Sequence, residues 1–188
     1  MSEDAQRARK AALRGEYAAR RAARSAAEKQ RLDSLLLRRA RECDAATIAA
    51  FVPVRGEPGS LDVLDELARR ARVLLPVTGP LSRRLEWAAY AGAEHLVPGP
   101  LGLLQPAAGD GSLLRDADIV LVPAVAIGLD GTRLGHGGGF YDRALTGVPT
   151  RRLVAVVHDD EVAATLPVEP HDVRVGWLCT PTRLQRLG

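Results

Sequence analysis

The feature that most restricts the fold is a set of short segments that are apolar at nearly every position. Residues 73–77, 118–123 and 152–158 show almost no alternation between polar and apolar side chains, which is typical of strands covered on both faces of a sheet. Helical patterns separate them, because helices are predicted at 26–42 and 61–71. Since strands alternate with helices, the sequence predicts an α/β fold, a three-layer α/β/α sandwich with a mostly parallel sheet.

Other segments extend this architecture. The Ala- and Arg-rich residues 4–23 favour a first helix, and residues 47–54 are typical of a further buried strand. A short strand is predicted at 87–90 and a last one at 173–179. The Gly- and Pro-rich residues 98–111 are predicted to form a surface loop.

Composition excludes several classes of protein. The 188 residues, interpreted as one domain over residues 1–188, are 46% hydrophobic and 26% charged, so the chain can bury a full core. No apolar run is long enough to cross a membrane, and the N-terminus is charged where a secretory signal is apolar. The two cysteines, Cys43 and Cys179, cannot build a disulfide framework. We therefore expect a cytoplasmic protein with no membrane partner.

Positive charge is concentrated near the N-terminus. Residues 1–41 carry 12 basic and 5 acidic side chains, a net charge of +7, whereas the rest of the chain has a net charge of −4. Lys10 and Arg14 lie four residues apart, so both project from one face of the first predicted helix and could bind neighbouring phosphate oxygens. On charge alone, with twelve basic residues in this region, a solvated basic helix face explains the same residues better.

The most informative segment is rich in glycine. Residues 128–139 contain 6 of the 18 glycines of the chain, and they lie between the strand predicted at 118–123 and a helix predicted to start at 140. Backbone N–H groups that converge at a helix N-terminus can bind a phosphate, although glycine-rich segments are also typical of turns. The segment matches neither a Walker loop nor a dinucleotide fingerprint. Further cations for a triphosphate must therefore come from elsewhere, and the N-terminal helix offers them.

The residues around this segment resemble the signature of the 5-formyltetrahydrofolate cyclo-ligase family, also called methenyltetrahydrofolate synthetases. The resemblance is strongest over residues 121–123 and 130–143. Shorter matches follow in the same order along the chain, and they are Lys10 with Arg14, Gly56-Glu57, Leu75-Pro76, Gln105-Pro106 and His171-Asp172.

The resemblance implies a Rossmann-like cyclo-ligase fold. It also implies an enzyme that uses ATP and Mg²⁺ to convert 5-formyltetrahydrofolate to 5,10-methenyltetrahydrofolate, with release of ADP and phosphate. Transfer of the γ-phosphoryl group to the formyl oxygen makes that oxygen a leaving group, and N10 of the folate then attacks the formyl carbon. Such a transfer needs mainly positioning and charge neutralisation. The expected partners are the small molecules ATP and 5-formyltetrahydrofolate, with no nucleic acid, and a monomer is expected.

The resemblance also implies roles for individual residues. Lys10 and Arg133 are expected to be catalytic, and Asp142 and Asp172 are expected to hold the Mg²⁺. The positions expected to bind ATP are Lys10, Arg14, Arg133, Leu134, Gly135, His136, Gly137, Gly138, Gly139, Phe140 and Tyr141. The positions expected to bind folate are Val52, Glu57, His136, Gly137, Gly138, Gly139 and Phe140.

From the sequence alone, several of the expected site residues also have simpler interpretations. Asp142 can be an acidic residue favoured in a first helical turn, and Asp172 can be a turn residue. Glu57 can be a solvated loop residue. Phe140 and Tyr141 can fill core beside the start of a helix.

The chain departs from the family pattern at positions that bear on pocket shape and folate affinity. These positions are residues 123–128, residues 58–60, Phe140 and Gly176, where an aspartate is common in the family. Two alternative functions therefore remain. One is a catalytically degenerate regulator that binds folate or nucleotide, and the other is a nucleic-acid-binding protein that uses the basic N-terminal helices.

Overall fold

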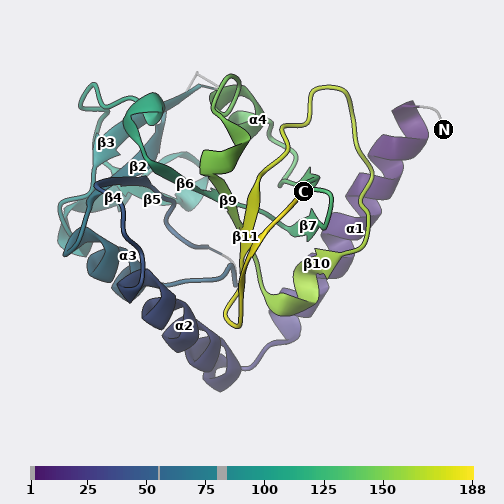
Figure 1. Ribbon diagram of the computed structural model, residues 1–188, viewed down its shortest axis with the longest axis horizontal. Coiled ribbons are helices and arrows are strands. Elements are labelled where there is room, and N and C mark those ends of the chain that lie inside the picture. The colour runs from purple at the N-terminus through teal and green to yellow at the C-terminus, as the bar shows by residue number, and fades with distance from the viewer. Residues whose placement is uncertain (1–2, 55, 80–83) are drawn as a thin grey trace.

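The computed structural model describes residues 3–54, 56–79 and 84–188 (Figure 1). Within these residues, the centre of the molecule is a seven-stranded sheet. The inner strands run parallel to one another, and only the two edge strands are antiparallel to their neighbours. The mostly parallel sheet predicted from the sequence is thus confirmed. In spatial order the strands are β12 (Leu184–Arg186), β11 (Trp177–Cys179), β9 (Leu153–Val156), β6 (Ile119–Pro123), β1 (Thr47–Ala49), β2 (Arg72–Thr78) and β3 (Leu85–Ala89).

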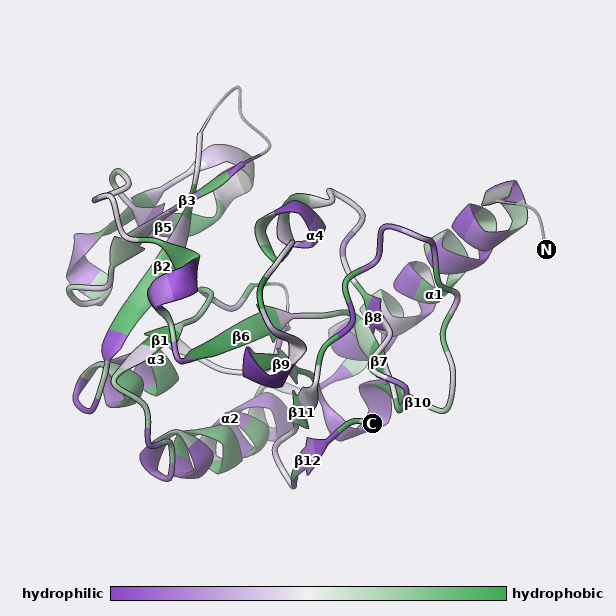
Figure 2. Ribbon diagram, turned by 45° about the horizontal axis from the view of Figure 1, so that its top comes forward, coloured by the Kyte–Doolittle hydropathy of each residue, from purple (hydrophilic) through white to green (hydrophobic). Residues whose placement is uncertain are grey.

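Helices cover the two faces of this sheet unequally. Helices α2 (Ala26–Arg41) and α3 (Leu61–Ala68) pack on one face, where their apolar side chains meet those of β1 and β2. The other face is covered by the five-residue helix α4 (Phe140–Ala144) and by coil, and the fully buried Leu145 after α4 belongs to the core cluster of β6 and β9. The apolar sheet lies between these layers (Figure 2). The predicted three-layer sandwich is confirmed, with a thin second helical layer.

Helix α2 shows how the sequence determines a helix and its orientation. The hydroxyl of Ser25 accepts a hydrogen bond from the backbone N–H of Glu28, which satisfies one free donor of the first turn. Leu32, Leu36 and Ala40 recur at helical spacing and are buried. The helix therefore presents one apolar stripe to the sheet and leaves its arginines outside.

Helix α1 (Glu3–Ala23) lies apart from these layers, at one side of the molecule (Figure 1). It packs beside a small sheet with the order β10 (Val162–Ala163), β7 (Ala126–Gly128) and β8 (Arg133–Leu134). Tyr17 of α1 is buried in an apolar cluster there. This packing brings the basic N-terminal helix to the glycine-rich segment. Among the described helices, none is both long and apolar enough to cross a membrane.

Several predicted boundaries were wrong. The strand predicted at 47–54 ends at Ala49. The N–H of Ala50 donates the last hydrogen bond to β2, at the Leu74 carbonyl oxygen, and Pro53 has no N–H with which to extend the pairing. The strand predicted at 173–179 is confined to β11.

The surface loop predicted at 98–111 is also partly wrong. It contains β5 (Leu104–Pro106), which pairs with β4 (Leu96–Pro98) in a two-stranded antiparallel sheet. The edge strand β12 was not predicted. Strands of three residues are too short to show a hydrophobic period in the sequence.

Candidate active site

The candidate site lies at the carboxyl ends of the parallel strands β1, β6 and β9. From these ends the chain leads to Glu57, Ala124 and His158 respectively. In open α/β sheets, ligands bind outside the carboxyl ends of the strands. The glycine-rich segment and helix α1 both reach this edge of the sheet.

The first half of the glycine-rich segment forms a tight turn between β7 and β8. The N–H of Gly128 donates to the Thr132 carbonyl oxygen at 2.8 Å, and Asp130 Oδ1 accepts the N–H of Thr132 at 3.0 Å. Gly131 has a φ of +83°, and a Cβ there would lie 2.5 Å from the Val175 carbonyl oxygen. Only glycine fits that position, so this half serves the fold, and the interpretation as a turn holds for it.

Three glycines of the second half, Gly135, Gly137 and Gly139, line a polar cavity of about 100 Å³. Arg14 Nε donates to the Gly135 carbonyl oxygen at 2.7 Å, and a Cβ on Gly137 would lie 3.4 Å from the Arg14 guanidinium carbon. The hydrogen bond from Arg14 joins α1 to the segment, and the φ of +95° at Gly137 favours glycine there. The residues that line the cavity are Lys10, Arg14, Arg133, Leu134, Gly135, Gly137, Gly139, Asp142, Glu169, His171 and Asp172.

Lys10 joins α1 to the segment before β11. Its side chain is only 4% exposed, and Nζ lies 2.7 Å from Glu169 Oε2 and 2.6 Å from Asp172 Oδ2. The hydrogen bond from Lys10 holds the pKa of Glu169 below its ordinary value. In Figure 1 the long connection between β10 and β11 runs beside α1, which agrees with these contacts. The ammonium group of Lys10 is thus balanced by two carboxylates.

Arg133 forms a second charged pair in the cavity. Its Nη2 donates to Asp142 Oδ1 at 2.6 Å, and its Nη1 donates to the Pro123 carbonyl oxygen at 3.3 Å. Its Nε is buried and has no hydrogen-bond partner among the residues that the structure describes. Arg133 therefore links the end of β6 to the first turn of α4 and keeps one donor unused.

The donor set of the cavity fits Mg²⁺. Asp142 and Asp172 both line it, and the ligand atoms of Glu169, His171 and Asp172 lie within 4.8 Å of one another. Mg²⁺ prefers one or two carboxylates together with phosphate oxygens and water. Glu169 was missed in the sequence, where its only signal was its position three residues before Asp172.

Glu57 lies on the other side of the glycine-rich segment. Its side chain is 4% exposed, its Oε1 is 3.2 Å from His136 Nε2, and its Oε2 accepts the N–H of Val54 at 3.1 Å. Arg21 Nη1 lies 4.0 Å from the same Oε1. The interpretation of Glu57 as a solvated loop residue was therefore wrong. His136 joins Glu57 to the segment that lines the cavity.

Tyr141 places a polar group in an apolar setting near Glu57. Its hydroxyl oxygen is buried and has no hydrogen-bond partner among the described residues. Burial, and to a smaller extent the Glu57 carboxylate, raise the pKa of Tyr141, so the phenol stays protonated. The site thus contains a neutral donor beside a buried carboxylate.

The structure does not gather all the predicted site residues in the polar cavity. Val52 is half-buried between β1 and Glu57. The Phe140 ring lies 5.7 Å from the Arg143 guanidinium carbon. The residues predicted to bind ATP that do not line the cavity are His136, Gly138, Phe140 and Tyr141.

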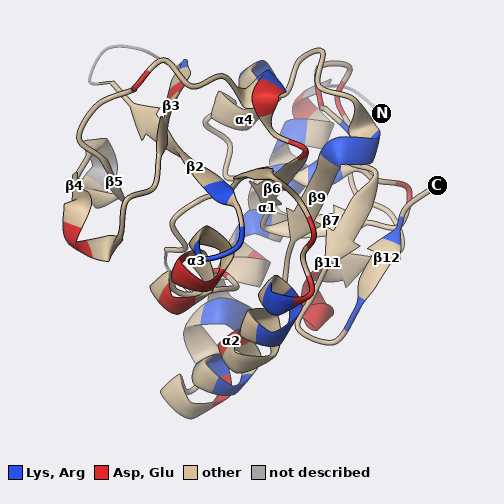
Figure 3. Cartoon of the chain, turned by 60° about the vertical axis from the view of Figure 1, so that its left-hand side comes forward, with Lys and Arg blue, Asp and Glu red and all other residues tan. Residues whose placement is uncertain are grey.

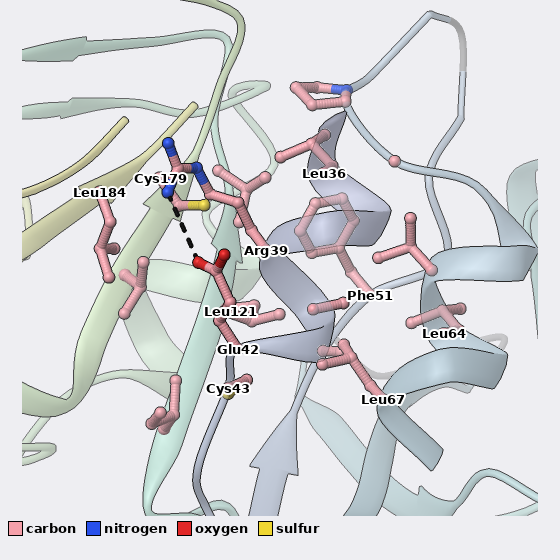
Figure 4. Close-up of a pocket in the computed structure, with 18 of the residues that line it drawn as sticks. Leu36, Arg39, Glu42, Cys43, Phe51, Leu64, Leu67, Leu121, Cys179 and Leu184 are labelled. Carbon is pink, nitrogen blue, oxygen red and sulfur yellow. Dashed lines mark ion pairs between the residues drawn. The ribbon is translucent and has the colours of Figure 1, made fainter. Parts of the chain in front are cut away.

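A larger cavity of about 420 Å³ lies on the α2 face of the sheet (Figure 4). Its wall is mainly apolar and includes Leu36, Phe51 and Leu121, while Arg39 and Glu42 form an ion pair of 3.9 Å beside it. None of the predicted site residues lines this larger cavity. The smaller polar cavity, which gathers cations and carboxylates, is therefore the candidate active site.

Fold and site together define the class of this molecule as an α/β protein with a densely charged, glycine-lined cavity at the carboxyl edge of a parallel sheet. The model of the 5-formyltetrahydrofolate cyclo-ligase family matches residues 6–181. The 5-formyltetrahydrofolate cyclo-ligase of Mycolicibacterium smegmatis is 42% identical over 73% of this chain and 74% of its own length. The enzyme of the same name from Escherichia coli K12 is 34% identical over 74% and 80%.

Solved structures agree with these relatives. The 5,10-methenyltetrahydrofolate synthetase of Aquifex aeolicus superposes with a TM-score of 0.83 at 27% identity, over 95% of this chain and 92% of its own. The synthetase of Mycoplasma pneumoniae, with a TM-score of 0.70 at 22% identity over 92% and 98%, supports the fold. The chain belongs to the 5-formyltetrahydrofolate cyclo-ligase family. The resemblance found in the sequence is confirmed, as is the prediction of a ligase of folate one-carbon metabolism.

Proposed function

We propose that the protein converts 5-formyltetrahydrofolate to 5,10-methenyltetrahydrofolate at the expense of ATP, with release of ADP and phosphate. One observation carries this proposal. Lys10 and Arg14 from the N-terminal helix meet Arg133 and three glycines around one cavity, in a member of this family. The three glycines are Gly135, Gly137 and Gly139. Several cations beside glycine backbone are the arrangement that a triphosphate requires.

The proposed reaction needs positioning more than a side-chain nucleophile. The formyl oxygen attacks the γ-phosphorus and the bond to ADP breaks, so the carbonyl oxygen becomes part of a phosphate ester. N10 then attacks the formyl carbon and loses its proton, and the bond from that carbon to the phosphorylated oxygen breaks, so that phosphate leaves. Lys10 and Arg133 neutralise the charge on the transferring phosphoryl group, and this charge stabilisation is the main catalytic contribution in such transfers.

We propose Mg²⁺ as the metal, held by Asp142 and Asp172. When bound, it supplies positive charge to the phosphate oxygens. In the structure, Arg133 binds Asp142 and Lys10 binds Asp172. Each aspartate can exchange its cation for the metal, and each freed cation can then bind phosphate, so that no buried charge loses its partner.

The folate would bind on the Glu57 side of the glycine-rich segment. A buried carboxylate can accept two N–H donors from one ring edge, and the reduced pterin offers such donors. The neutral hydroxyl of Tyr141 lies near Glu57 and lacks a partner among the described residues. The remaining positions proposed to contact the folate are Val52, His136, Gly137, Gly138 and Phe140.

We also propose that the protein acts as a cytoplasmic monomer on these small molecules, with neither nucleic acid nor membrane as a partner. Both N-terminal helices carry many Lys and Arg residues (Figure 3). However, Lys10 and Arg21 are buried against carboxylates, and Arg14 is bound to the Gly135 carbonyl oxygen. Part of the basic charge is therefore used inside the molecule, which weakens the case for a nucleic-acid-binding function.

A coupled assay tests the proposal. Purified protein is mixed with MgATP and 5-formyltetrahydrofolate, and the absorbance of methenyltetrahydrofolate is followed together with ADP. We expect one ADP for each product molecule. Absence of turnover across a broad range of pH and substrate concentration would reject the proposal. Calorimetry that shows binding of both ligands without ADP release would instead support the degenerate regulator.

A further inference from the structure

A buried ion pair joins α1 to the segment after β9. The loop that carries Glu57 packs against this pair. Arg21, in the last turn of α1, donates from Nε to Glu161 Oε1 at 2.7 Å and from Nη2 to Glu161 Oε2 at 2.9 Å. Its Nη2 also donates to the Ala124 carbonyl oxygen at 2.7 Å. Glu161 is 0% exposed. Because a two-bond pair fixes the plane of the guanidinium, it holds α1 in place against the carboxyl ends of β6 and β9.

The same carboxylate orients a histidine. Glu161 Oε2 accepts the backbone N–H of His158 at 2.9 Å, and His158 Nε2 lies 3.1 Å from the carbonyl oxygen of Gly56. A carbonyl oxygen only accepts, so Nε2 carries the proton. His158 is 1% exposed, and its Nδ1 has no partner among the described residues. His158 therefore connects Glu161, which binds its backbone N–H, to Gly56, which binds its imidazole and precedes Glu57.

The loop that carries Glu57 contacts both Arg21 and His158. Gly56 has a φ of +77°, and a Cβ there would lie 3.4 Å from the Cβ of Arg21, so the loop backbone packs on the last turn of α1. Arg21 Nη1 is also 4.0 Å from Glu57 Oε1. Both the backbone before Glu57 and its carboxylate are thus placed by residues that are bound to Glu161.

We propose that Arg21, His158 and Glu161 are positioning residues for Glu57 and, through it, for the folate part of the substrate. The inference rests on the proposed function. None of the three lines the cavity that contains Lys10. Their loss therefore weakens the binding of 5-formyltetrahydrofolate and leaves the binding of ATP nearly unchanged.

Variants at His158 test this selectivity. His158→Phe keeps a ring in the buried space and removes the donor to Gly56, whereas His158→Gln places an amide N–H near the position of Nε2. For His158→Phe we expect the KM for 5-formyltetrahydrofolate to rise about tenfold and the KM for ATP to stay within about twofold. His158→Gln should restore most of the difference.

Two further variants separate positioning from general stability. In His158→Asn the side chain is polar, but its amide is too short to reach Gly56. We therefore expect the KM for 5-formyltetrahydrofolate to rise as in His158→Phe. This variant replaces His158→Phe in the test if the Phe variant does not fold. Tyr90→Phe is the control, because it removes a buried hydrogen bond of 2.6 Å to Asp65 near the opposite edge of the sheet. We expect it to lower the melting temperature without changing either KM.

The outcomes distinguish this inference from the proposed function. Equal rises in both KM values, or a lower melting temperature with both KM values unchanged for His158→Phe and His158→Asn, would overturn the positioning role. Lack of turnover by the unmodified protein would instead reject the proposed function. Calorimetric titration with 5-formyltetrahydrofolate alone gives a second readout, in which the Phe variant should bind about tenfold more weakly than the Gln variant.

Discussion

Single residues of the site are held in charge pairs that a ligand can replace. Lys10 binds Glu169 and Asp172, and Arg133 binds Asp142. Buried charges are stable only when paired, since removal of one partner leaves the other uncompensated. A metal-bound polyanion supplies both signs of charge at once, so these residues can change partners while the site stays balanced.

Replacement of Lys10 tests the phosphate side of the site. Lys10→Ala removes a cation from the cavity, and we expect the apparent KM for ATP to rise by about tenfold or more, with a smaller change in the KM for folate. Steady-state kinetics with each substrate varied in turn measures both values. Arg9→Ala, an exposed residue of the same helix, is the matched control. An unchanged dependence on ATP would remove Lys10 from the site.

His158 predicts how stability depends on pH. Burial lowers the pKa of His158 below its ordinary value of 6.5; the Glu161 carboxylate opposes this shift, and Arg24 and Arg21 add to it. The unfolded chain therefore binds a proton at His158 that the folded chain does not, so this residue lowers stability as the pH falls below about 6.5.

Urea unfolding at several pH values tests this expectation. Between about pH 7 and about pH 5, the free energy of unfolding should fall more for the unmodified protein than for His158→Gln, because glutamine does not titrate. Identical pH dependence in the two proteins would show that His158 is not kept neutral by its surroundings.

Among the structural elements, the glycine-rich segment shows what a sequence can and cannot predict. The density of glycine indicated that bare backbone is needed, but not that the segment divides into a turn and a cavity wall. That division depends on distant partners, the Val175 carbonyl oxygen close to Gly131 and the Arg14 guanidinium that binds the Gly135 carbonyl oxygen. Contacts between segments far apart in the chain leave no local pattern.

A pair of glycine substitutions tests this division. Gly131 and Gly147 both have a positive φ, of +83° and +81°, but only Gly131 has a backbone oxygen within 2.5 Å of a Cβ position. Gly147→Ala should cost about 1 kcal/mol of folding free energy, and Gly131→Ala about 3 kcal/mol. Thermal or urea unfolding gives both values. Equal losses would show that Val175 does not restrict Gly131.

The departure from the family pattern at Gly176 has a structural reason. Its N–H donates to the Thr150 carbonyl oxygen at 3.0 Å, and a Cβ there would lie 2.5 Å from that oxygen. An aspartate, which the resemblance in the sequence led us to expect at this position, therefore does not fit this backbone. Gly176 belongs to the close packing between β11 and the start of β9, and it lies outside the polar cavity.

Most large elements could be predicted because their signals are local. Helices α1, α2 and α3 follow from helical spacing, and β2, β6 and β9 follow from continuous apolar runs. The strands β4, β5, β7, β8, β10 and β12 are two or three residues long, so tertiary pairing alone defines them. Likewise, Glu161 ends a run of three acidic residues in a 3-10 turn, and Glu169 lies in coil. Nothing in their sequence neighbourhood indicates their distant partners, Arg21 and Lys10.

Across the whole molecule, the site joins segments from both ends of the chain. Lys10 comes from the first helix, Arg133 from the small sheet, and Asp172 from the connection before β11. The cavity therefore exists only when α1 is packed against the completed fold. Part of the positive charge near the N-terminus, on Lys10, Arg14 and Arg21, is thus used in contacts with the rest of the fold.

The most direct test of the proposed phosphate site is a crystal structure of the protein with Mg²⁺ and an ATP analogue that cannot be hydrolysed. We expect the phosphates to lie between Lys10, Arg14 and Arg133 and to contact residues 135–139. A triphosphate bound elsewhere, with residues 135–139 only connecting β8 to α4, would contradict the proposed site.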